Sequence, residues 1–187
     1  MEFHKTYNHA AAVLVPLVEK EGETCLLFER RAYTIDAQPG EVSFPGGMHE
    51  GDEAIEETAV RETAEELGID RAQIELLGEM DPIVGVGRAV YPFVGRINHY
   101  EGTFSKEEVD HVFLVPLSFL KEYQPRTSYT STYIEPAEDF PFELIEGGRD
   151  YPWHTGRTEM YFYEYEGEII WGLTARILHA FAASFDT

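Results

Sequence analysis

The hydrophobic pattern begins with two apolar runs separated by a short polar turn. Residues 10–18 read AAAVLVPLV and residues 24–31 read TCLLFERR, with EKEGE between them. Short runs of this kind that flank a glycine-containing polar stretch are typical of paired strands. The pattern therefore predicts a β-hairpin.

The next segment predicts a loop followed by a helix. Residues 32–45 contain two prolines and a glycine, which break regular structure, and they lead through FPGG into an acidic stretch. Asp52 is expected to cap a helix over Glu53–Leu67, because its side chain can accept hydrogen bonds from the free N–H groups of the first turn. Gly68 is expected to end that helix in the left-handed conformation.

Further along, the pattern predicts three more strands, a second hairpin and a final helix. We expect the strands near residues 74–78, 89–97 and 109–115, the hairpin over 158–172 with its turn at EGE, and the helix over 173–185. The aromatic stretch from Tyr123 to His154 shows no clear period. No repeat or linker is visible, so we expect one domain over residues 1–187.

Composition and charge narrow the possible partners. The chain is 43% hydrophobic and 13% aromatic, which is enough to build a packed interior. Its 35 acidic residues outnumber 14 basic ones and give a net charge of -21, which opposes binding to nucleic acid or to an anionic membrane. We therefore expect neither partner, and an anionic substrate would need cations to mediate its binding.

Cysteine, histidine and targeting signals point to no special chemistry. Cys25 is the single cysteine and lies in an apolar run, so we expect a buried thiol and no intramolecular disulfide. No histidines have the H-x-x-x-H spacing of a zinc site. The start, MEFHKTYNHA, does not resemble a leader, and no apolar run reaches membrane-spanning length. We expect a cytoplasmic protein.

The acidic helix brings together carboxylates that repel one another. At about 100° per residue, Glu62, Glu65 and Glu66 share one face, and that face borders the apolar side of the helix. Such a cluster is stable if it binds a hard divalent cation such as Mg²⁺ or Mn²⁺. Arg61 can pair with Glu57 one turn earlier or brace the carboxylates. A solvated acidic surface is the alternative, and the local spacing alone does not decide between them.

The whole stretch GMHEGDEAIEETAVRETAEELGI resembles the Nudix box, G-x5-E-x7-R-E-U-x-E-E-x-G-U, where U is apolar. The matching residues are Gly47, Glu53, Arg61, Glu62, Glu65, Glu66, Gly68 and Ile69. Thr63, at an apolar position of the motif, is the one departure. Many fixed positions in a short segment make this a specific signal.

The resemblance implies a Nudix-type α/β/α sandwich with a mixed sheet and a loop-helix-loop catalytic segment. It also implies that Glu62, Glu65 and Glu66, helped by the Gly46 carbonyl, hold Mg²⁺ or Mn²⁺, with Arg61 orienting them. Members of the family hydrolyse small nucleoside diphosphate derivatives. A homodimer is a family-based expectation.

The resemblance leaves the general base open. Glu62 is one candidate, since Nudix enzymes differ over the residue that takes the proton from water. The other is Glu108, chosen over Glu107 and Asp110 in the loop before the strand at 109–115. A merely solvated acidic loop is the alternative reading of that segment.

Upstream of the box, LFERRAYTIDAQPGEVSFPGG resembles the signature of coenzyme A diphosphatases, LLTxR[SA]x3Rx3Gx3FPGG. On this basis Arg31 and Gly40 are candidate substrate-binding residues, although Arg31 could be an ordinary strand-end arginine. The segments at 112–120 and 170–178 also look like this subfamily. Three departures are Phe28 for Leu, Glu29 for Thr and Asp36 for Arg.

The leading hypothesis is hydrolysis of coenzyme A, and two alternatives stay open. Because Asp36 reverses the charge of an arginine that could meet a phosphate, ADP-ribose or another nucleoside diphosphate derivative is the second candidate substrate. A non-catalytic nucleotide-binding module is the third reading, disfavoured by the intact set of glutamates. A calcium-binding structural protein would need a D-x-D-x-D-G loop, which the sequence lacks.

Overall fold

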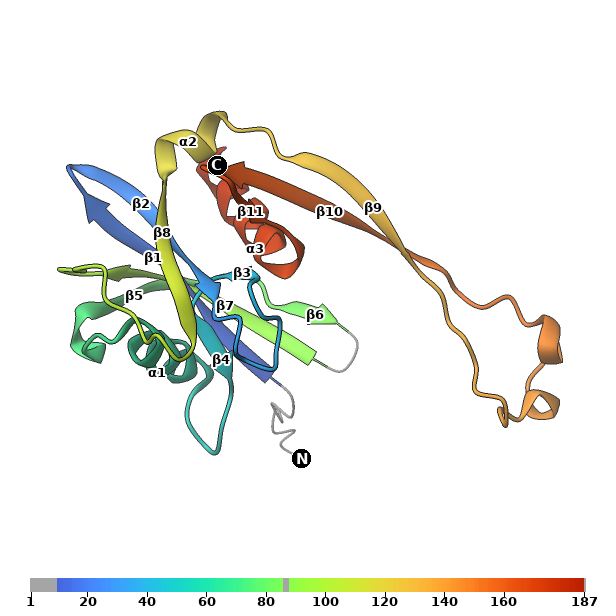
Figure 1. The fold of residues 1–187 in the computed structure, drawn as a ribbon. Helices are drawn as coiled ribbons and strands as arrows, with labels where there is room; N and C mark the ends of the chain where they lie inside the picture. Colours follow the sequence, from blue (N-terminus) through green and yellow to red (C-terminus); the bar gives the residue numbers. More distant parts are fainter. Residues whose placement is uncertain (1–9, 86–87, 187) are drawn as a thin grey trace.

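The computed structural model describes residues 10–85 and 88–186. The expectation drawn from the first nine residues therefore lies outside the described part of the chain. Figure 1 shows a body built from a twisted sheet and helices, from which a long two-stranded ribbon projects.

The sheet of the body is mixed, with a central path in the order β3-β2-β1-β7-β5. β1 runs parallel to β7, whereas the pairings of β1 with β2 and β4, and of β7 with β5 and β6, are antiparallel. The strands are β1 (Ala10–Lys20), β2 (Glu23–Arg31), β3 (Val42–Ser43), β4 (Gly46–Met48), β5 (Ile74–Glu79), β6 (Ile83–Gly85), β7 (Arg88–Ile97) and β8 (Val109–Pro116). The predicted first hairpin and the three later strands are confirmed.

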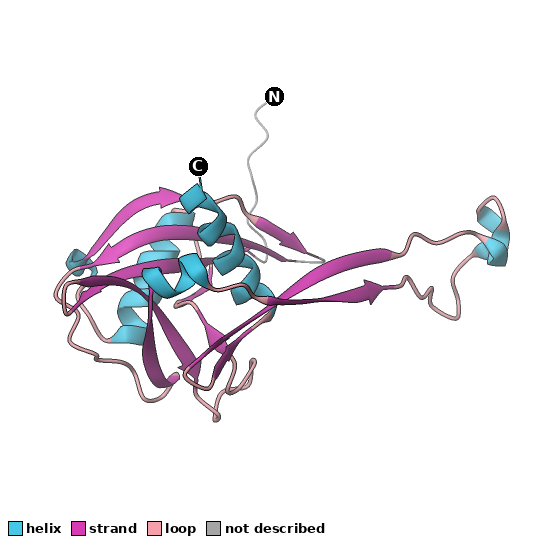
Figure 2. Ribbon diagram, turned by 90° about the horizontal axis from the view of Figure 1, so that it is seen from above, coloured by secondary structure: helices cyan, strands magenta, loops and turns pink. Residues whose placement is uncertain are grey.

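Helices cover both faces of this sheet because alternate residues of β1 point in opposite directions. One face packs α1 (Ile55–Leu67) through a cluster that includes Ala12, Leu14, Ala59 and Leu67. The other face packs α3 (Gly172–Ala183) through a cluster that includes Ala11, Val15, Ile177 and Phe181. The predicted α/β/α sandwich is confirmed (Figure 2). A short helix, α2 (Leu117–Glu122), follows β8.

The two ends of α1 differ in how well they were predicted. Gly68 ends the helix as expected, with a φ of 62° and an N–H directed to the carbonyls of Ala64 and Glu65. The start was wrong: the helix begins at Ile55 after Ala54, and Asp52 is exposed in the preceding turn. The Ala54 N–H donates instead to the Glu57 carboxylate at 3.1 Å.

The projecting ribbon accounts for the stretch that had no readable pattern. It consists of β9 (Arg126–Thr132) paired antiparallel with β10 (Gly156–Tyr165), and every residue of β9 is exposed. Short 3₁₀ turns at Phe142–Leu144 and Gly148–Asp150 form its tip, shown at the end of the ribbon in Figure 2. The tip packs aromatic rings on one another, namely Phe140, Phe142, Tyr151 and Trp153.

At its base, the ribbon continues into the predicted second hairpin. β10 turns at Glu166 and Gly167, both with positive φ, into β11 (Glu168–Ile170), and α3 follows. The hairpin and the final helix are confirmed. Two further 3₁₀ turns lie at Arg71–Gln73 and Ser184–Asp186.

Candidate active site

A cavity of about 400 Å³ opens between the loop after β2, the carboxylate face of α1 and the start of α3. Of the candidate residues predicted from the sequence, those that line it are Arg31, Gly46, Glu62, Glu66 and Glu108. Its remaining wall is largely apolar and includes Ile35, Val42, Phe44, Val90, Trp171, Leu173 and Ile177. The cavity thus combines charged groups with an apolar surface.

Two glycines at the end of FPGG allow the carboxylates to reach the loop backbone. A Cβ on Gly47 would lie 2.4 Å from the carboxylate of Glu62. Gly46 has a φ of 150°, and a Cβ there would lie 2.3 Å from the Ala12 carbonyl oxygen of β1. The Gly46 N–H donates to Glu66 Oε2 at 2.8 Å. Gly46 therefore lets the loop lie against β1 and hold Glu66, and Gly47 leaves room for the Glu62 carboxylate.

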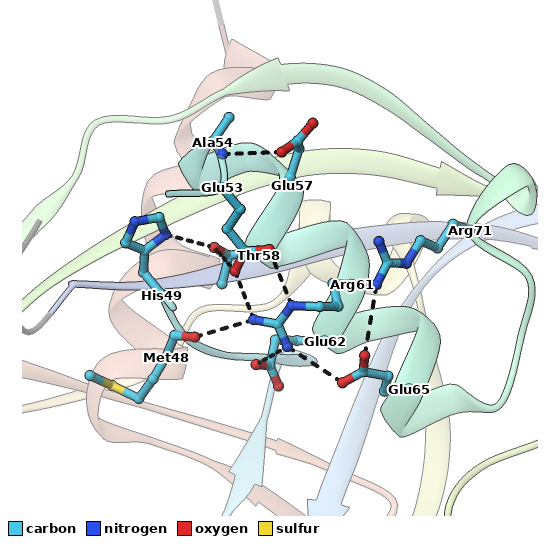
Figure 3. Close-up of polar contacts among 10 residues, drawn as sticks. All are labelled: Met48, His49, Glu53, Ala54, Glu57, Thr58, Arg61, Glu62, Glu65 and Arg71. Carbon is cyan, nitrogen blue, oxygen red and sulfur yellow. Dashed lines mark hydrogen bonds and ion pairs between the residues drawn. The ribbon is translucent and has the colours of Figure 1, made fainter. Parts of the chain in front are cut away.

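Arg61 holds the acidic segment together (Figure 3). Its guanidinium donates to Glu53 at 2.8 and 3.2 Å and to Glu62 at 2.7 Å, with longer contacts of 3.4 Å to Glu65 and to the Met48 carbonyl. The sequence left two roles open for Arg61, pairing with Glu57 or bracing the carboxylates, and these contacts correspond to bracing. The alternative, a pair with Glu57, is not found among the described contacts, and the Glu57 carboxylate accepts from the Ala54 N–H at the helix start instead.

Glu53 is drawn out of the helix by these contacts. It accepts from Thr58 Oγ1 at 2.9 Å in addition to Arg61. The hydrogen bond from Arg61 is the main reason that the pKa of Glu53 falls to about 2. This long-range pairing, which spans eight positions, explains why α1 begins at Ile55 and not at Glu53.

Glu65 is the predicted metal ligand that lies away from the cavity. Its side chain is 56% exposed and contacts Arg61 and, at 3.8 Å, Arg71. Within residues 10–85 and 88–186, no three His, Cys, Asp or Glu side chains are arranged to hold a metal ion as they stand. Glu65 would have to leave Arg61 to join Glu62 and Glu66.

The donor types nevertheless fit a hard divalent cation. Glu66 is only 5% exposed, and its burial, together with the nearby Glu29, raises its pKa well above the ordinary value. Burial also raises the pKa of Glu62. Buried carboxylates without a cation favour the protonated form, and a bound divalent cation reverses that preference. Oxygen ligands of this kind are those that Mg²⁺ and Mn²⁺ bind.

Glu108 reaches the cavity through the irregular edge of β8. The register between β2 and β8 shifts at Arg30 and Arg31, and the Ala32 N–H donates to the Glu108 carbonyl at 2.8 Å. Such bulges redirect side chains near functional sites. Neither Glu107 nor Asp110 lines the cavity, and Asp110 contacts His111 at 2.8 Å. The choice of Glu108 within its loop thus agrees with its position.

Gly40 shapes the loop and does not itself line the cavity. Its φ is 71°, and a Cβ there would lie 2.4 Å from the Tyr33 ring. Its carbonyl accepts from Arg30 Nη1 at 2.6 Å, and Arg30 also pairs with Glu168. Gly40 therefore acts through the course of the loop, which presents Arg31 to the cavity.

Two arginines line the cavity, whereas the nearby Asp36 does not. Arg31 and Arg88 line the cavity, and Arg31 donates to the Ala37 carbonyl at 3.1 Å. Asp36 is exposed, although its neighbours Ile35 and Ala37 line the cavity. Asp36 therefore adds its negative charge on the solvent side.

Sequence reasoning missed two residues at this site. Trp171, 42% exposed, stands between β11 and α3 and lines the cavity, whereas the tip aromatics of the ribbon do not. Glu29, 1% exposed, directly follows the apolar run at residues 25–28 of β2, and burial raises its pKa to about 7. The departure from Thr at position 29 was its only signal; Trp171 had none, because its approach to the cavity depends on the packing of α3.

The sequence of the chain matches the NUDIX domain over residues 8–161, more than half of its length. This chain belongs to the Nudix hydrolase family. It is 35% identical to the uncharacterized Nudix hydrolase NudL of Photorhabdus laumondii, over 94% of this chain and 84% of that protein. It is 33% identical to the peroxisomal coenzyme A diphosphatase NUDT7 of Mus musculus, over 75% of this chain and 61% of that protein.

Solved structures agree with the fold. The Nudix hydrolase RenU from M. smegmatis matches with a TM-score of 0.52 at 21% identity, over 60% of this chain and 73% of that one. The Nudix fold, the box residues and the relatives together make this protein a hydrolase of diphosphate substrates. Nudix hydrolases generally need divalent metal ions and bind small nucleoside diphosphate derivatives. None of the helices in the described residues is long and apolar enough to cross a membrane.

The Glu53–Arg61 pair predicts a pH-dependent contribution to stability. The folded-state pKa of Glu53, about 2, lies below its ordinary value of 4.5, so the pair stabilises the fold above that value and the contribution is lost as the pH falls toward 2. We expect Glu53→Gln to be less stable than the wild type at about pH 7 and the gap to shrink by about pH 3, measured by urea unfolding.

Glu143→Gln, an exposed change at the ribbon tip, is the control and should show little gap at either pH. A gap for Glu53→Gln that is the same at both pH values would contradict the assigned pairing.

Proposed function

We propose that this Nudix hydrolase cleaves the diphosphate bond of coenzyme A or its derivatives, giving 3′,5′-ADP and 4′-phosphopantetheine. The observation that carries the proposal is that one cavity is lined both by box glutamates, Glu62 and Glu66, and by Arg31 of the upstream signature. Similarity to the mouse coenzyme A diphosphatase supports this substrate, while the NudL relative supports only the family.

We further propose that Glu62, Glu66 and the Gly46 carbonyl hold Mg²⁺ or Mn²⁺, with Glu65 joining after it rotates away from Arg61. When bound, the metal would neutralise the bridging phosphates and lower the pKa of the attacking water. Arg61 restrains Glu62 and Glu65 through charge-assisted hydrogen bonds. The family requirement for a divalent metal and the donor types support this assignment.

The cavity also offers groups for the phosphates and for the proton. Arg31 and Arg88 line it and can contact phosphate oxygens. Glu108 is our choice of general base over Glu62, because Glu62 is engaged by Arg61 at 2.7 Å while Glu108 lies exposed at the cavity. In this arrangement the box holds the metal and a separate loop removes the proton.

The apolar wall suits the non-phosphate parts of the substrate. Trp171 and Leu173 lie at the start of α3 and are 42% and 41% exposed. An exposed indole can stack on a purine base, and an aliphatic side chain can contact the pantetheine arm. A substrate that joins a base and an extended arm to a diphosphate therefore matches a cavity that combines an apolar wall with charged groups.

ADP-ribose is the second candidate substrate, and Asp36 is the observation that favours it. Coenzyme A carries a 3′-phosphate in addition to its diphosphate, and Asp36 removes a cation that the related signature places near the entrance. ADP-ribose lacks that phosphate and would not need the missing charge.

Products decide between the two substrates. The purified protein, incubated with Mn²⁺ or Mg²⁺ and either coenzyme A or ADP-ribose, should convert coenzyme A to 3′,5′-ADP and 4′-phosphopantetheine, resolved by chromatography. Turnover of ADP-ribose with coenzyme A left intact would overturn the leading proposal in favour of the second. Binding without turnover of either would support a non-catalytic nucleotide-binding module.

The metal-site assignment predicts a large effect of one carboxylate. Glu66→Gln should lower kcat by roughly 100-fold or more while the protein stays folded, because it removes a charge from the reacting centre. The matched control is Glu56→Gln, an exposed change in the first turn of the same helix, which should change kcat little. Equal activity of both variants would contradict the assignment.

Stacking on Trp171 predicts an effect on substrate binding. A base stacked on an aromatic side chain contributes about 1 to 3 kcal/mol, so Trp171→Ala should raise KM by roughly 5- to 150-fold with little change in kcat. Tyr133→Ala, which removes an aromatic side chain 72% exposed on the ribbon, is the control. A drop in kcat with unchanged KM would place Trp171 in another role.

A further inference from the structure

Glu29 is a buried acid just behind the cavity. It lies near the end of β2, opposite Ser43 of β3 on one side and Val112 of β8 on the other. Strands therefore enclose it on both sides, and its exposed fraction is 1%. It does not line the cavity, although its neighbour Ser43 does.

One of its two carboxylate oxygens has no partner. Ser43 Oγ donates to Glu29 Oε1 at 3.1 Å, whereas Oε2 is buried without a hydrogen bond from any described residue. A buried, unpaired carboxylate oxygen is unfavourable, and buried charges in folded proteins are paired with an opposite charge or coordinate a metal. The hydroxyl of Ser43 alone would be satisfied by a neutral side chain at this position.

The Glu29 side chain lies on the face of the sheet that α1 covers. On β2, Cys25, Leu27 and Glu29 alternate onto the same face, and the first two pack in the cluster beneath α1. Glu29 interacts electrostatically with Glu66 of α1, with Glu108 and with Arg31. The carboxylate cluster therefore extends inward by one residue that is not part of the box.

We propose that Glu29 is a further ligand for a divalent cation, and that it completes an inner coordination position together with Glu66. Two buried carboxylates that repel each other are stabilised when a hard cation lies between them. Glu66 and Ser43 line the cavity, and Ser43 donates to Glu29, so a cation held by Glu66 would lie on the cavity side of the Ser43–Glu29 pair. Ligation requires side-chain rotation, because the described acids do not converge as they stand.

This inference rests on the proposed function only in its metal requirement. A glutamate at position 29 departs from the coenzyme A diphosphatase signature, which has Thr there. Glu29→Thr therefore restores the signature, and Glu29→Gln keeps the shape while it removes the charge. Both remove the negatively charged carboxylate and keep a polar group beside Ser43.

Equilibrium binding of Mn²⁺ without substrate tests the proposal. Titration calorimetry of the full chain with MnCl₂ should show an affinity for Glu29→Gln that is lower by roughly tenfold or more than that of the wild type. Glu79→Gln, an exposed acid on β5, is the matched control and should stay within about twofold. Affinity for Glu29→Gln within about twofold of the wild type would overturn the proposal.

Thermal unfolding separates ligation from a structural role. In EDTA, Glu29→Gln should raise Tm, because it removes the repulsion between Glu29 and Glu66, and added Mn²⁺ should raise its Tm less than that of the wild type. A lower Tm in EDTA with the full Mn²⁺-induced increase would mean that Glu29 serves only the fold, and the proposal would be wrong. If Glu29→Gln does not fold, Glu29→Thr is read in the same two ways.

The outcome is independent of the substrate. The Mn²⁺ titration contains no nucleotide. If Glu29→Gln binds Mn²⁺ more weakly than the wild type, and the wild type leaves coenzyme A intact, this inference is supported and the proposed function is overturned. The opposite pair of results would overturn this inference and leave the proposed function standing.

Discussion

The structure of the site depends on the way one guanidinium relieves the repulsion among carboxylates. Arg61 contacts Glu53, Glu62 and Glu65, which come from the turn before α1 and from the helix itself. Without this cation the helix would carry a run of uncompensated negative charge beside the apolar core. The same contacts set where the helix begins, because they hold Glu53 outside it. The contacts of Arg61 thus both stabilise the start of α1 and orient the candidate metal ligands.

The loop that faces the carboxylates of α1 approaches both β1 and those carboxylates closely. Gly46 lies against β1 and donates to Glu66, and Gly47 leaves room for the Glu62 carboxylate. A side chain at either glycine would push the loop from the strand or the carboxylate from the loop. The loop and helix are therefore fitted to each other, and the fit places the acidic side chains at the cavity while the apolar side of α1 packs on the sheet.

Features that depend on neighbours in sequence could be predicted, and those that depend on distant contacts could not. The first hairpin, the second hairpin and the Gly68 stop follow from apolar periodicity and glycine conformation. The start of α1 was wrong because the pull of Arg61 on Glu53 outweighs the capping preference of Asp52. β9, the outer strand of the ribbon, had no readable pattern because both of its faces meet solvent.

The site shows the same division. The box motif led to Glu62 and Glu66, and the upstream signature led to Arg31, because these residues recur in fixed patterns. Trp171 reaches the cavity only because α3 packs across the sheet face opposite to α1, which no local pattern encodes. Glu29 looked like a simple departure from a signature until its burial and its unpaired oxygen were seen together.

The exposed position of Asp36 limits how strongly its negative charge can affect substrate binding. An exposed carboxylate acts on a phosphate through water and salt, and its effect fades over roughly 8 to 10 Å at physiological ionic strength. Arg31 and Arg88 line the cavity itself, where charges are screened less. The loss of an arginine at position 36 therefore bears mainly on groups of the substrate that remain near the entrance, such as a 3′-phosphate. Under the proposed metal assignment, the diphosphate approaches Glu62 and Glu66 and contacts the cations that line the cavity. In that proposal, cleavage and the choice of substrate depend on different parts of the site.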